Sequence, residues 1–165
     1  MKKALLLTIV AVIFGVLNCS AQKKKKTVHE FRYEVVSMGV GAQGTDLIKV
    51  YSYTKNDKEV SDLAKINAVH AVLFKGIAGT SGTEMQPALV KNREKENNAE
   101  FFDNFFENGT YNQYVTLSSD GVVNAKDRMK VGKEYKIGII VSVNKKDLRK
   151  YLESEGIIKG LGSMF

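Results

Sequence analysis

Residues 60–74, VSDLAKINAVHAVLF, constrain the fold more than any other stretch of this chain. Apolar and small side chains recur there at three- and four-residue steps, which places them on one face of a helix. Much of that face is alanine, and small side chains let a helix lie close to the surface that it covers. Strand-like runs stand before and after. We therefore predict a helix that lies across a β-sheet, with Asn67 at the edge of its buried face.

The rest of the chain supplies alternating strand patterns and two more helical ones. Residues 31–38, 46–54, 111–118, 128–131 and 135–143 are expected to be strands. Residues 92–108 and 145–155 have the spacing of helices. Hairpins mixed with helices predict an α+β fold, a mainly antiparallel sheet of about five strands with two to three helices packed on one face. Residues 135–143 are the most apolar strand and the candidate for the centre of the sheet.

The first 21 residues have the pattern of a secretory signal peptide. Two lysines precede the apolar run 4–17, and small residues follow it. That run is shorter than the roughly 20 residues that a membrane span needs. We expect cleavage after Ala21 and export to the periplasm or to an outer-membrane-associated position. Acylation of Cys19 is the alternative, although Asn18 fits poorly the small position before a lipidated cysteine.

The remainder reads as a short basic segment followed by one domain. Residues 22–29 are expected to be a basic tether and residues 30–165 a single α+β domain. Because Cys19 is the one cysteine, the mature domain has no disulfide.

The positive charge is concentrated in the tether. Removing Lys2 and Lys3 lowers the net charge from +7 to +5, and the run of four lysines leaves only +1 for residues 27–165. A nucleic-acid-binding protein normally carries its charge on the folded surface, so we expect no nucleic-acid partner. The run is interpreted as a solvated tether or a weak contact with anionic lipid headgroups. It consists of Lys23, Lys24, Lys25 and Lys26.

Familiar catalytic and metal-binding patterns do not emerge from the sequence. His29 and His70 have no neighbouring histidine or cysteine in sequence, so a zinc site is not expected. Ser81 does not lie in a Gly-x-Ser-x-Gly elbow. The glycines at 76, 79 and 82 follow a helix, whereas a phosphate loop opens one. We expect no metal, no cofactor and no enzymatic activity. A hydrolase would require a carboxylate pair, or His70 with a serine, to converge in one cleft.

Two segments are candidates for contact with a partner. Residues 76–91 form an irregular stretch longer than a simple connector, and such loops are often functional. Residues 101–106 present a phenylalanine-rich helix face, which is interpreted as core packing, as a partner contact or as a carbohydrate or lipid platform. The candidate contact residues are Gly79, Ser81, Gly82, Met85, Phe101, Phe102 and Phe105.

Two stretches together resemble small envelope domains of the kind found in the flagellar T-ring assembly protein and related small lipoproteins. They are AKINAVHAVLFKGIAG, residues 64–79, and YKIGIIVSVNKKDLRKYLESEGI, residues 135–157. The signal ending Cys-Ser-Ala-Gln is similar to that of exported proteins of Bacteroidota. The resemblance implies a non-enzymatic part of an envelope assembly. Residues 76–91 and the phenylalanine-rich helix depart from it.

These observations lead to two hypotheses of different classes. The first is a non-catalytic exported cell-envelope domain that mediates protein–protein interaction or assembly, with envelope proteins as partners. The alternative is a periplasmic small-ligand-binding protein with a pocket between the sheet and the aromatic helix. Deletion of residues 78–88 tests the first, and a ligand-induced thermal shift that is lost in Phe102→Ala tests the second.

Overall fold

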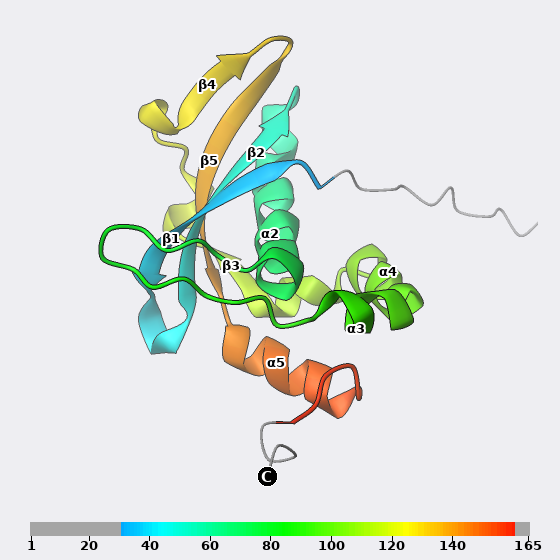
Figure 1. The fold of residues 1–165 in the computed structure, drawn as a ribbon. Helices are drawn as coiled ribbons and strands as arrows, with labels where there is room; N and C mark the ends of the chain where they lie inside the picture. Colours follow the sequence, from blue (N-terminus) through cyan, green and yellow to red (C-terminus); the bar gives the residue numbers. More distant parts are fainter. Residues whose placement is uncertain (1–30, 161–165) are drawn as a thin grey trace, which may run out of the picture. The chain divides into compact units, whose positions relative to one another are not determined.

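The chain divides into two units after residue 30, and the computed structural model describes residues 31–160, which all belong to the second unit. The predicted signal peptide, Cys19 and the four lysines of the tether lie outside the described residues. The described part is an α+β fold, as the sequence predicts, with a five-stranded antiparallel sheet and four helices (Figure 1).

The sheet is built around its longest strand. The strands are β1 (Tyr33–Val40), β2 (Asp46–Thr54), β3 (Val115–Leu117), β4 (Arg128–Val131) and β5 (Glu134–Val143). They lie in the order β1-β2-β5-β3, and β4 pairs with β5 on the same edge as β3, at the other end of the strand. β5 is therefore the central strand, as its apolar sequence predicts, and β1 and β2 form the expected antiparallel hairpin.

Alternation along β2 and β5 separates the two faces of the sheet. Ile48 and Val50 on β2 point to the same side as Ile139 and Val141 on β5, and all four are fully buried. The opposite side carries Lys49, Tyr51 and Tyr53 from β2. Burial of one valine or isoleucine side chain contributes about 1.5–3 kcal/mol, so the inward residues fix the register of the sheet.

Helix α2 (Val60–His70) covers the buried face of the sheet (Figure 1). Ala64 and Ala68 are fully buried, which agrees with a helix that lies close to the strands. Asn67 was expected at the edge, and that prediction is wrong because its side chain is 2% exposed and donates a 2.9 Å hydrogen bond to Ser52 Oγ on β2. A polar side chain thus links the helix to the sheet inside the core.

The remaining helices follow the predicted pattern with one interruption. The helix expected over 92–108 is divided into α3 (Asn92–Asn97) and α4 (Ala99–Glu107) at Asn98. Asn98 has φ −120° and ψ 30°, and its side chain donates to the carbonyl of Glu94. Such local side-chain bonds compete with helical backbone bonds. Residues 111–114 were expected to extend β3 but lie in a 3-10 turn, Thr110–Tyr114.

The last helix, α5 (Lys145–Ser154), begins directly after β5. Asn144 caps it, because its side-chain oxygen accepts a 3.1 Å hydrogen bond from the backbone N–H of Asp147. Leu148 and Leu152 are fully buried, and Ile157 and Ile158 are buried after the helix ends. The C-terminal segment therefore packs into the core, as its apolar spacing predicts.

Candidate functional site

The stretch after α2 forms an ordered β-hairpin, which we call the finger (residues 77–86). The backbone groups of Ile77 and Gln86 exchange two hydrogen bonds of 2.8 and 2.9 Å. Nearer the tip, Thr80 and Thr83 exchange two more of 3.1 and 3.0 Å, and their side-chain oxygens lie 2.8 Å apart. The candidate residues Gly79, Ser81, Gly82 and Met85 all lie in the finger and are exposed.

Close packing of the backbone explains the glycines at its base. A Cβ on Gly76 would lie 2.6 Å from the carbonyl oxygen of Gln86, and one on Gly79 would lie 2.5 Å from that of Thr83. No real side chain occupies such positions. Close packing thus accounts for two of the three glycines that were considered as a phosphate loop, and the third, Gly82, has a φ of 119°, which favours glycine.

A groove of about 480 Å³ separates the finger from the ends of β1 and β2. We call it the finger groove. Val40 and Met85 both line it and are 75% and 74% exposed. The other lining residues are Ser37, Gly39, Asp46, Gly82, Thr83, Glu84, Gln86, Pro87 and Lys145.

Three polar side chains that line the finger groove are joined by hydrogen bonds. Gln86 Nε2 donates to Asp46 Oδ1 at 2.8 Å, and Lys145 Nζ donates to Gln86 Oε1 at 3.0 Å. Asp46 is 9% exposed, and no hydrogen-bond donor among the described residues reaches its Oδ2 atom. Burial lowers the pKa of Lys145, while the nearby Asp46 carboxylate opposes that shift. These two hydrogen bonds connect the finger to β2 and to α5.

A second cavity, of about 430 Å³, lies between the C-terminal end of α2 and helices α3 and α4. We call it the aromatic cavity. After His70 the helix continues as a single π turn, Ala71–Lys75, in which Gly76 N–H donates to the carbonyl of Ala71 at 2.8 Å. π turns are rare in proteins, and those that occur are often found at functional sites. The cavity is lined by Phe31, His70, Phe74, Asn92, Lys95, Glu96, Ala99, Phe102, Asp103 and Phe106.

His70 is the buried polar residue of this cavity. Its Nδ1 atom lies 2.6 Å from the hydroxyl oxygen of Tyr33, and its ring stacks on Phe31 with 3.7 Å between centroids. His70 and Tyr33 are 7% exposed each. Burial raises the pKa of Tyr33 well above its usual value, so this phenol stays protonated. No local sequence pattern indicates that His70 contacts a strand residue 37 positions away.

The candidate phenylalanines have different environments. Phe102 and Phe105 are 5% and 3% exposed, and Phe101 is half-buried. Phe105 stacks near Tyr114 and Tyr151, with centroids 6.2 and 6.0 Å away. The face therefore packs mainly inward, and Phe102 also lines the aromatic cavity.

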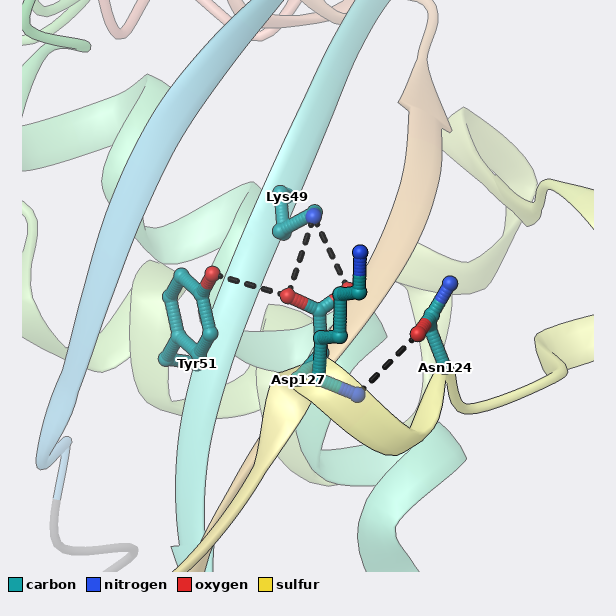
Figure 2. Close-up of polar contacts among 5 residues, drawn as sticks. Lys49, Tyr51, Asn124 and Asp127 are labelled. Atoms are coloured by element: carbon teal, nitrogen blue, oxygen red, sulfur yellow. Dashed lines mark hydrogen bonds and ion pairs between the residues drawn. The ribbon is translucent and has the colours of Figure 1, made fainter.

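The outer face of the sheet carries a network of paired charges, which Figure 2 shows in part. Lys49 Nζ donates to both oxygens of Asp127, at 3.0 and 2.9 Å, and the Tyr51 hydroxyl donates to Asp127 Oδ1 at 3.0 Å. The hydrogen bond from Lys49 lowers the pKa of Asp127, and that from Tyr51 adds to the effect. The side chain of Asn124 accepts from the backbone N–H of Lys126 and holds the turn that presents Asp127.

Neighbouring strands extend this network. Lys136 on β5 donates to Glu34 on β1 at 2.6 Å, and the Tyr53 hydroxyl donates to the same carboxylate at 2.7 Å. Since these carboxylates have cationic partners within the sheet face, we assign the network to stability of the outer face.

Within residues 31–160, no group of three or more His, Cys, Asp and Glu side chains is arranged to hold a metal ion. Over the same residues, no helix combines the length and the apolar character that crossing a membrane requires. Comparison of the chain with protein-family models, with curated proteins and with solved structures gives no match.

Proposed function

We propose that this chain is a non-catalytic exported cell-envelope domain that binds another protein through the finger groove. The observation that carries the proposal is the pair Val40 and Met85, which come from segments 45 residues apart in sequence yet line one groove with three-quarters of their surface exposed. Exposed apolar side chains that gather at one concave place mark protein contacts more often than those that are scattered.

The neighbouring strand supports a protein partner over a small molecule. β1 is at the end of the strand order, and within the described residues its outer edge pairs with no other strand. An extended segment of a partner could add to such an edge by backbone hydrogen bonds. The finger groove begins where β1 ends, so one extended segment would contact both the strand edge and the groove.

The finger is built to present a fixed surface. Its four backbone hydrogen bonds and the two side-chain hydrogen bonds of Gln86 hold its shape in the absence of a partner. A contact surface that is already ordered loses little conformational entropy on binding. The tethered, exported character proposed from the sequence places such a surface among envelope proteins.

Site-specific photo-cross-linking in intact cells tests the proposal. A benzophenone side chain is placed at Met85, at Val40 or, as control, at Val122, which is 73% exposed and does not line the groove. The expected result is one envelope-protein adduct that forms from positions 40 and 85 and not from position 122. Val40→Asp should abolish the adduct from position 85, whereas Val122→Asp should leave it.

Two outcomes contradict the proposal. One is equal cross-linking from all three positions, which indicates unspecific contact. The other is an adduct from position 40 that persists after deletion of residues 78–88, because that deletion removes most of the finger.

A further inference from the structure

The aromatic cavity is lined by partly exposed aromatic residues and by more acidic than basic side chains. Phe31, Phe74 and Phe106 line it and are half-buried. Its volume of about 430 Å³ falls within the range of roughly 300–1,000 Å³ that is typical of small-ligand sites. Among the described residues, the charged ones that line the cavity are Lys95, Glu96 and Asp103, whose formal charges leave a net charge of −1.

The chain itself places an ammonium group on an aromatic ring of the cavity. Lys95 Nζ lies 4.4 Å from the centroid of the Phe74 ring, and both residues line the cavity. Outside the lining, Lys75 Nζ lies 4.0 Å from the ring centroid of Tyr33, the partner of His70. A cation within about 6 Å of a ring face is attracted by the negative face of the ring. One ring face of the cavity, that of Phe74, is thus already used as a cation site.

We propose that the aromatic cavity binds a small organic cation, a primary or quaternary amine attached to an apolar body. The apolar body packs against the phenylalanine rings, and the cationic group lies against ring faces near Glu96 and Asp103. An organic anion of the same size would meet the negative ring faces and two carboxylates, with Lys95 as the single cation among the lining residues that the structure describes. This site is separate from the finger groove, and the proposal does not depend on partner binding there.

Substitution of Lys95 distinguishes a cation-binding cavity from an anion-binding one. It occupies the face of Phe74 and repels a second cation, so Lys95→Met should strengthen the binding of an amine. If the cavity instead selects anions, Lys95 is their counter-ion and the same substitution weakens binding. Glu96→Gln should weaken amine binding. The matched control is Glu100→Gln, which removes the same charge from α4 at an exposed position outside the cavity lining.

The probes are 2-phenylethylamine, 2-phenylethanol and 3-phenylpropanoate, titrated into the folded protein. Binding is followed by the NMR signals of the His70 ring, since His70 lines the cavity. We expect the amine to shift the His70 signals and to bind about tenfold more tightly than the alcohol, the effect of roughly one cation–π contact. Tighter binding of 3-phenylpropanoate, weaker amine binding in Lys95→Met, or no shift of His70 with any probe overturns the proposal.

Discussion

The hydroxyl oxygen of Tyr33 lies 2.6 Å from His70 Nδ1, and this contact joins the first strand to the end of the central helix inside the core. Tyr33→Phe removes the hydroxyl and leaves the nitrogen without this partner. A buried polar atom that loses its hydrogen bond costs about 1–3 kcal/mol. We expect a loss of that size in the free energy of unfolding, measured by urea denaturation.

Tyr53→Phe is the matched control for that measurement, because its hydroxyl binds Glu34 on the outer face of the sheet. A surface substitution of this kind changes stability by about 0.5 kcal/mol or less. Equal losses in both variants would contradict the role assigned to the Tyr33–His70 contact.

The hydrogen bond from Asn67 to Ser52 is expected to stabilise the fold only when both side chains are present. Asn67→Ala and Ser52→Ala should each destabilise the fold, by about 1–3 kcal/mol for the asparagine. The double variant should lose less than the two single variants together, with a coupling of about 0.5–3 kcal/mol. Additive losses in urea denaturation would mean that the 2.9 Å contact contributes nothing.

Gly138 is predicted to be needed for the outer face of β5. A Cβ there would lie 2.7 Å from Cε1 of Tyr51 and 3.0 Å from Cβ of Asp127, so Gly138→Ala must displace the ring. Overpacking of this kind costs about 1–3 kcal/mol. The loss should be smaller in a Tyr51→Ala background, and an equal loss in both backgrounds would exclude the ring as the cause.

Acid should weaken the outer network through Asp127. Its pKa in the folded protein is lowered, chiefly by the Lys49 hydrogen bond, so the charged carboxylate stabilises the fold above its ordinary pKa of 3.8. That stabilisation is lost as the pH falls through the lower pKa of the folded state. Asp127→Asn should therefore cost about 1–2 kcal/mol at pH 7.

The difference between Asp127→Asn and the unaltered protein should shrink as the pH falls below 3.8. Urea denaturation at a series of pH values measures it. Glu84→Gln, at an exposed position of the finger, is the control. A stability difference for Asp127→Asn that stays constant as the pH is lowered below 3.8 would refute the stabilising role of the Asp127 carboxylate.

Gly79→Val should open the finger without unfolding the domain. The new Cβ would collide with the carbonyl of Thr83, so the hydrogen bonds between Thr80 and Thr83 cannot form. Amide hydrogen exchange should then lose protection at Thr83 while residues of β5 keep theirs. Ser81→Ala at the exposed tip should change neither, and intact protection in Gly79→Val would disprove the steric argument.

Local patterns predicted most of the elements. Alternation along residues 135–143 identified the central strand, and Asn144 marked the start of α5, because both signals act over a few residues. Asn67 was misplaced because an amide on a helix does not reveal whether a serine on a strand will lie opposite it. Asn98 interrupts a helix whose periodicity continues across it.

The candidate sites were less predictable, since they depend on residues distant in sequence. The pairing of Lys49 with Asp127 joins positions 78 residues apart, and the aromatic cavity brings Phe31 to Phe74 and Phe106. The finger was expected as an irregular loop, because the clash that fixes Gly79 involves the backbone of Thr83. Contacts between residues distant in sequence leave no local pattern and become apparent only in the folded structure.

The central place of β5 sets the order in which the chain can fold. β2 gains its second neighbour, and β3 and β4 their partner, only when residues 134–143 are available. β2 and β5 are far apart in sequence, and pairings between such segments form slowly. Until β5 is in place, β2 and α2 lack the strand against which both pack. A chain whose last third completes its sheet cannot close that sheet until most of its length has been synthesised, a consequence that is compatible with the export that we propose.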